Sequence, residues 1–305
     1  MKNERNVKQT PSNRQFETKV QSLITLLGDD DRSVRKIAWS QIFSCGNDAV
    51  PYLENAVNSD LDGTTRMRSA RLLKKMHRKS LIDEFRVLAL WDDADIDLED
   101  GAYLIAKTAF PNLEKKSISG ELDWLAELAG ARIDEESSVR DKIKALNSVI
   151  YRREGFHGNV EDYHKPNNSF INKVLETRAG IPITLSIIYL SVAKRLKLPV
   201  RGVNTPIHYM CVYETDEEPI FINTFDRGRM MTLEKCLMFL HGLGAHIRHT
   251  NIYSISRRET LQRMLHNLVL AYHARADLEN VTFIKKLLHI LKYYGKNKKN
   301  NESLR

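Results

Sequence analysis

The chain has 305 residues, 42% of them hydrophobic and 28% charged, an ordinary globular composition that excludes wholesale disorder and is long enough for two compact units. No stretch approaches the ~20 apolar residues that span a bilayer, and the polar first residues do not resemble a signal peptide, so we expect a cytoplasmic protein without membrane association. The three cysteines, Cys45, Cys211 and Cys236, are odd in number and far apart, which predicts reduced, non-catalytic thiols.

The formal net charge is +8, and part of it lies close to the C-terminal end, between Lys285 and Arg305. A solvated basic tail accounts for that part. Nucleic acid is not the expected partner, because no zinc finger, RNP-type aromatic stretch or Gly-x-x-Gly clamp accompanies the charge. The Lys- and Asn-rich segment 295–305 is predicted to be a disordered basic tail.

The first part of the chain, residues 14–115, has apolar residues at helical spacing. A stripe that contains Leu23 recurs at Leu53, a shift of 53 − 23 = 30 residues, which lies within the range of helical repeats. The Asp- and Arg-bearing turns 29–35 and 60–66 resemble those of HEAT repeats. Residues 14–115 are therefore predicted to form a HEAT-like helical region, and it includes a helix over 98–110 that Asp97 caps.

The second part is predicted to add a short sheet to further helices. A long polar loop, 155–169, interrupts the helical pattern, and a period of two residues then predicts strands over 199–203, 209–213 and 220–225. The fold class is therefore α+β and mostly α. The expected division is a core over 116–250, a helical hairpin over 251–294 and the tail. Helices of this part are expected at 118–131, 137–152, 170–178, 182–196, 232–240, 260–274 and 281–294.

A specific family likeness lies in the predicted core. The segments that carry it are 168–186, NSFINKVLETRAGIPITLS, and 193–200, AKRLKLPV, with extensions at 145–147, 155–159, 202–208 and 221–228. They resemble the SirB-type branch of the transglutaminase-like superfamily, a bacterial family with a papain-type core. The last helices are similar to the TPR-like hairpin that closes many members, and HEAT-like helices in front resemble the Bacteroidetes-type form.

The resemblance implies a site. An active member needs a cysteine in the first turn of the helix after Gly180, a histidine that activates it, and an amide or carboxylate that orients the histidine. Aligning this helix by its ends places Pro182 at the cysteine position. His208 falls at the histidine position and Asn223 at the orienting position. The expected site keeps the histidine and its partner and lacks the nucleophile.

Two functions follow as hypotheses. The first is a pseudoenzyme, a non-catalytic transglutaminase-like protein that acts as a protein-binding, peptide-binding or scaffold module through its helical repeats. The alternative is a cysteine-less amide hydrolase or acyltransferase that uses His208 with Asn223 and an unidentified nucleophile such as Ser186 or Ser169. Neither hypothesis requires a cofactor or a metal. Nucleic-acid binding through the basic end would rest on charge alone.

A cleft beside His208 is the expected binding surface of the first hypothesis. Aromatic residues of the loop and the following strand, Phe156, Tyr163 and Tyr209, are predicted to form its walls. Asn168 and Ser169 are further candidates in the same loop. Such a polar cleft with aromatic walls suits an extended peptide.

Overall fold

The computed structural model describes the backbone of residues 11–59, 61–205, 207–245 and 252–302. The chain divides into two compact units between Asp83 and Glu84, inside helix α4 (Gly63–Leu90), whereas the sequence predicts a boundary near residue 115. Helix α5 (Leu98–Lys107) explains the difference, because it packs against helices of the second unit. Among the described residues, no helix combines the length and the apolar character needed to cross a bilayer.

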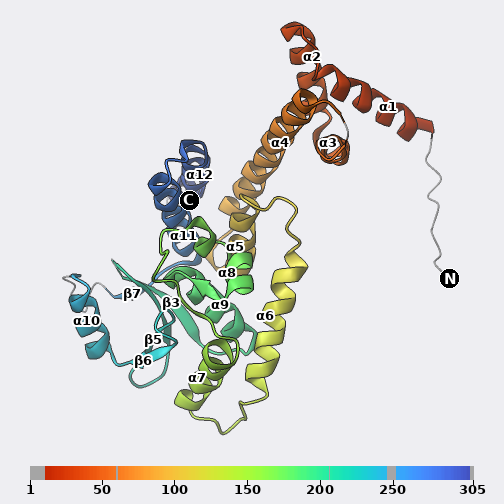
Figure 1. The fold of residues 1–305 in the computed structure, drawn as a ribbon. Coiled ribbons are helices and arrows are strands. Elements are labelled where there is room, and N and C mark those ends of the chain that lie inside the picture. The colour runs from red at the N-terminus through yellow and green to blue at the C-terminus, as the bar shows by residue number, and fades with distance from the viewer. Residues whose placement is uncertain (1–10, 60, 206, 246–251, 303–305) are drawn as a thin grey trace, which may run out of the picture. The chain divides into compact units, whose positions relative to one another are not determined.

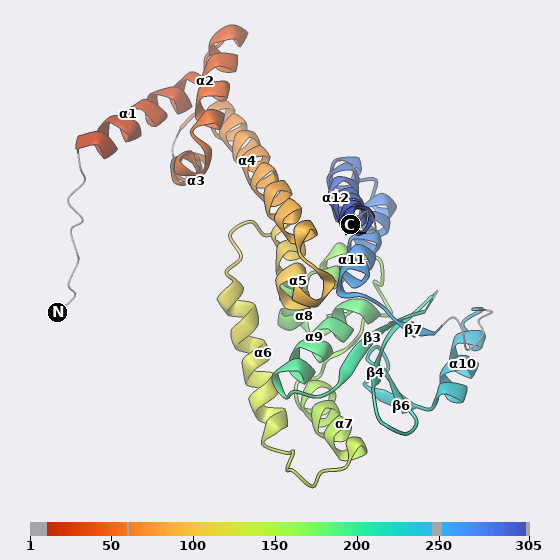
Figure 2. The ribbon, with the colours of Figure 1, turned by 180° about the vertical axis from the view of Figure 1, so that it is seen from behind.

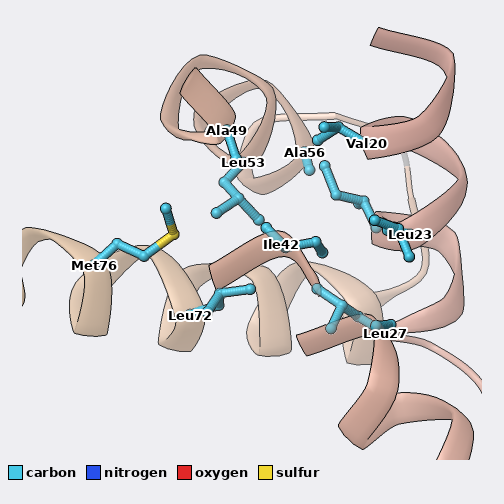
Figure 3. Packing of buried hydrophobic residues seen from close by; sticks show 11 residues of the cluster. Val20, Leu23, Leu27, Ile42, Ala49, Leu53, Ala56, Leu72 and Met76 are labelled. Atoms are coloured by element: carbon cyan, nitrogen blue, oxygen red, sulfur yellow. The ribbon is translucent and has the colours of Figure 1, made fainter. Parts of the chain in front are cut away.

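The first unit is entirely helical over its described part. It contains α1 (Pro11–Leu26), α2 (Arg32–Ser44), a 3-10 turn (Gly46–Ala49), α3 (Val50–Val57) and the first part of α4. Figure 3 shows side chains of all four helices meeting around Ile42. The helix α4 runs without interruption to Leu90, since no Gly or Pro follows Gly63 within it.

The second unit confirms the α+β, mostly α class. Helices pack on both faces of one small sheet (Figures 1 and 2). The helices are α5, α6 (Lys115–Gly130), α7 (Val139–Asn147), α8 (Ile171–Thr177), α9 (Pro182–Arg195), α10 (Leu233–Gly242), α11 (Arg257–Ala274) and α12 (Leu278–Glu302). The sheet has the order β6-β5-β4-β3-β7 and is antiparallel throughout. Its strands are β3 (Val200–Asn204), β4 (Tyr209–Tyr213), β5 (Ile220–Asn223), β6 (Arg229–Met231) and β7 (Tyr253–Ser254).

The helix α9 is the centre of this unit. Every residue from Pro182 to Ala193 is buried, because α5, α6, α7, α8, α11 and the sheet all pack on this helix. Alternation along β4 divides the sheet into two faces. Cys211 points to α9, where its thiol lies 3.9 Å from the Ser186 carbonyl oxygen, while Met210 and Val212 pack with α10.

Several elements were not predicted because they are too short or too irregular to leave a periodic signal. The two-residue strands β1 (His157–Gly158) and β2 (Ala179–Gly180) pair in parallel and tie the long loop to the residues before α9. The helix expected over 137–152 is present, but its second part, Ser148–Arg153, is a π-helix that continues α7. At the other end, α12 keeps a helical backbone through Glu302, in place of a disordered tail from 295, and residues 303–305 lie outside the described part.

Candidate functional site

His208 and Asn223 meet at one end of the sheet. The register between β4 and β5 pairs Cys211 with Ile222. With this register, His208 and Asn223 point to the same face of the sheet, on a diagonal across the neighbouring strands. His208 Nε2 lies 2.9 Å from Asn223 Oδ1, and the side chains are 7% and 1% exposed. The structure thus brings together the histidine and the orienting amide that the sequence singles out.

The hydrogen-bond partners of the Asn223 amide determine which ring nitrogen of His208 carries a hydrogen. Its Oδ1 also accepts the backbone N–H groups of Phe225, at 3.2 Å, and Asp226, at 3.3 Å. Because those donors can only face an oxygen, His208 Nε2 must carry a hydrogen and donate it to Oδ1. In the neutral ring Nδ1 is then the acceptor.

The surroundings of His208 favour this neutral form. Burial lowers the pKa of His208 below its ordinary value of 6.5, and the cation of Arg263 lowers it further, against the opposing effects of the Asn223 hydrogen bond and the Asp226 charge. At neutral pH the ring is therefore a hydrogen-bond acceptor and a potential base.

The start of α9 is where the family resemblance places the nucleophile. Pro182 occupies the first turn, where its missing N–H costs nothing, after the extended residue Ile181. The Thr224 hydroxyl donates to the Pro182 carbonyl oxygen at 3.3 Å, so the Ser186 hydroxyl, 2.7 Å from Thr224 Oγ1, donates to Thr224 in turn. The hydroxyl hydrogen of Ser186 is therefore used in the hydrogen bond to Thr224 and not in one to His208.

The cysteines do not supply a thiolate either. Burial raises the pKa of Cys211 and of Cys236 to about 12, and His208 and Cys211 point to opposite faces of the sheet, as their spacing predicts. Cys45 lies half-buried in the first unit. A thiol at the start of α9 would have had the helix dipole to activate it.

The expected aromatic walls of the cleft need correction. Phe156 and Tyr209 are completely buried, 0% and 1% exposed, because Arg178 covers the ring of Phe156 and Tyr209 packs against Thr260 on α11. They therefore cannot line an open cleft. Tyr163 is 39% exposed and does present a surface.

The loop over 155–169 is held by its own amides. Asn168 Nδ2 donates to the carbonyl oxygens of Asp162 and Tyr163, at 2.7 and 3.2 Å, while its Oδ1 accepts from Asn159. Asn168 and Ser169 are both buried. These contacts make Asn168 the residue that fixes the loop beside the site, and they leave Tyr163 at its surface.

Sequence reasoning missed three residues at this site. The ring of Phe225 contacts His208 and Tyr163 edge-on, with centroid distances of 5.9 and 6.0 Å, and the ring of Phe239 on α10 contacts His208 edge-on at 5.4 Å. Phe225 lies two residues after the orienting Asn223, and this proximity in the sequence could have identified it as a residue of the site. The third, Arg263, reaches the site from α11, whose packing against the loop no local pattern reveals.

Comparison with known proteins agrees with the geometry. Residues 116–266 match the family model of the transglutaminase-like superfamily. The chain is 31% identical over 160 residues to the UPF0162 protein of Xylella fastidiosa, which covers 52% of this chain and 57% of that protein. It is 27% identical over 180 residues to the UPF0162 protein of Vibrio cholerae, with 57% and 66% covered.

A eukaryotic protein shares the same region. Human F-box only protein 21 is 32% identical over 145 residues, which are 45% of this chain and 22% of that protein. The chain thus spans little more than half the length of the Xylella relative and a fifth of the human one. No solved structure matches the chain. Residues 116–266, in which His208 and Asn223 are paired, form a domain of the transglutaminase-like superfamily.

Proposed function

We propose that this protein is a non-catalytic, peptide-binding member of the transglutaminase-like superfamily. One observation carries the proposal: among the described residues, the ring of His208 makes a hydrogen bond to Asn223 and none to a hydroxyl or thiol. Nucleophilic catalysis requires a nucleophile within hydrogen-bond reach of its base. Here His208 is oriented by Asn223, and the family resemblance puts Pro182, in the first turn of α9, at the nucleophile position.

The surface around His208 suits an extended chain. The rings of Tyr163, Phe225, His208 and Phe239 form a continuous row of edge-to-face contacts, and at least Tyr163 is open to solvent. Apolar side chains of a ligand can rest on such rings. The acceptor Nδ1 of the neutral histidine can receive a backbone N–H of the ligand. In this proposal His208 recognises the ligand instead of accepting a proton in a reaction.

The relatives support a modular role. The shared region makes up about half of a bacterial protein and a fifth of a human F-box protein. A domain that recurs in chains of such different length works beside different neighbouring segments. Peptide recognition is a function that tolerates this variety, because it needs one surface and no second domain. We expect the partner of this chain to be a protein or peptide, and not a nucleic acid.

A peptide-display selection against the purified full chain tests the proposal. We expect enriched peptides that bind by calorimetry, with a loss of about tenfold in affinity in Tyr163→Ala, because one aromatic contact contributes about 0.5–1.5 kcal/mol beyond its area. The matched control is Tyr293→Ala, which removes an exposed ring on α12 that stacks on His289. Equal losses in the two variants, or no enrichment at all, would contradict the proposal.

The rival activity is tested on the same peptides. Mass spectrometry after long incubation should show them intact, without hydrolysis or deamidation of glutamine. Turnover that disappears in both His208→Ala and Ser186→Ala would instead establish the cysteine-less hydrolase or acyltransferase and end the non-catalytic account.

A further inference from the structure

Arg263 is a half-buried cation without a carboxylate partner among the described residues. It lies on α11, and its Nη1 donates to the Thr205 carbonyl oxygen at 2.7 Å and to Asn204 Oδ1. Its guanidinium lies over the ring of Tyr209, 5.7 Å from the centroid. None of these three groups carries a negative charge. The positive charge is therefore uncompensated, although nearby acceptors hold the side chain in place.

Two other partly buried arginines of this unit differ in this respect. Arg178 pairs with Glu121 at 2.6 Å, and Arg195 pairs with Glu99 at 2.7 Å. Their charges are neutralised at the site of burial. Burial lowers the pKa of Arg263. Burial acts in the same direction on Arg195, but hydrogen bonds to carboxylates outweigh it there and raise the pKa of Arg195. A cation that is partly removed from water and left without an anion costs free energy, and an arriving anion would recover it.

The position of Arg263 places this charge beside the proposed peptide surface. α11 packs against the 3-10 turn Pro166–Ser169 that ends the long loop, and the Arg263 cation acts electrostatically on both Tyr163 and His208. Arg263 Nη1 donates to the Thr205 carbonyl oxygen, and the Thr205 N–H donates to the His208 carbonyl oxygen. Arg263 is thus linked to His208 through Thr205. The other guanidinium nitrogens, Nη2 and Nε, have no acceptor among the described residues.

We propose that Arg263 binds a carboxylate of the ligand through Nη2 and Nε, and that the hydroxyl of Tyr163 donates a further hydrogen bond to it. The fork of two parallel N–H groups fits a carboxylate in a bidentate manner, and a pre-positioned guanidinium loses little freedom on binding. This inference rests on the proposed function and adds a specificity to it: the peptide carries an acidic group, at its C-terminus or on a side chain, next to the residues that lie on the aromatic row.

A purely structural role is the competing account. In that account Nη1 clamps residues 204 and 205, and the remaining nitrogens only meet water. Arg257 offers a matched control on the same helix, because its Nη1 also clamps backbone carbonyl oxygens, those of Ala94 and Ile96. Both arginines should then affect stability, and neither should affect the binding of an anion.

The test follows the guanidinium signals by NMR on the full chain, with Nε assigned by Arg263→Lys and Arg257→Lys. The probes are N-acetylglycine, which presents a C-terminal carboxylate, N-acetyl-glutamate α-amide, which presents a side-chain carboxylate, N-acetylglycinamide and inorganic phosphate. We expect at least one carboxylate to shift the Arg263 signal saturably, and the preferred one reveals its source. The neutral amide and the Arg257 signal should not respond.

Two variants complete the test. Arg263→Lys keeps the charge and loses the fork, so it should weaken carboxylate binding about tenfold or more, while Tyr163→Phe should weaken it by a smaller factor. Absence of a saturable shift, an equal response of Arg257, or tighter binding of phosphate than of either carboxylate would overturn the inference. If selected peptides bind with full affinity to Arg263→Lys, the peptide-binding function stands and the carboxylate subsite does not.

Discussion

The two halves of the site, which meet at the end of β5, differ in what they are built to do. Asn223 holds His208 with an amide oxygen that accepts three N–H groups, whereas the neighbouring Thr224 closes the start of α9 with hydroxyl and carbonyl contacts. The first half has the form of a catalytic orienting pair and the second the form of ordinary core packing. In the proposed function, the oriented histidine serves recognition of a ligand in place of a reaction.

The largest effect is expected where the orienting half is removed. In Asn223→Ala the N–H groups of His208, Phe225 and Asp226 lose their common acceptor, and a buried donor without a partner costs about 1–3 kcal/mol. We expect unfolding free energy in urea to fall by about 2–4 kcal/mol. Asn223→Asp keeps the acceptor and should lose far less. A small loss in the alanine variant would mean that the amide is not structural.

The helix-start half should be less sensitive. Ser186→Ala removes one hydroxyl that donates to Thr224, so the expected cost is about 1 kcal/mol, because a net hydrogen bond contributes about that amount. The double variant with Thr224→Val should show coupling between the two sites in a mutant cycle. Peptide affinity should be unchanged in Ser186→Ala. A loss of binding without a loss of stability would place Ser186 at the ligand instead.

The pH dependence of stability sharpens the comparison further. Burial depresses the pKa of folded His208 below 6.5, despite the Asn223 hydrogen bond, with Arg263 adding to the depression and Asp226 opposing it. The unfolded chain then binds more protons just below pH 6.5, so the contribution of His208 is complete above pH 6.5 and is lost as pH falls toward the folded pKa. His208→Gln should flatten this segment of the stability profile, and an unchanged profile in that variant would contradict this expectation.

The smallest effect is expected at the far end of the chain. Deletion of residues 295–305 should leave the melting temperature almost unchanged, since this segment is rich in Lys and Asn and poor in apolar residues. A drop of several degrees on thermal unfolding would show that the end of α12 is needed by the rest of the unit.

Local sequence patterns predicted the helices and strands better than they predicted which side chains are exposed at the site. Helical spacing predicted α9 to within a residue, and alternation predicted β4 from Tyr209 to Tyr213, because both periods are set by local geometry. The His208 and Asn223 pair came from the family resemblance. Phe156 and Tyr209 were misplaced as cleft walls, since their burial depends on Arg178 and on α11, which lie far away in the sequence. Arg263 was missed for the same reason.

The central claim is that the site lacks only its nucleophile. It is tested most directly by restoring a thiol at the start of α9 in Pro182→Cys, in a Cys45→Ser background where Cys211 and Cys236, with pKa values of about 12, stay unreactive. The rate of alkylation is measured against pH, with and without His208→Ala. The account predicts a thiol pKa below that of an ordinary cysteine, because the helix start and His208 both favour the thiolate, and a return toward the ordinary value in His208→Ala. A normal profile that ignores the histidine would contradict it.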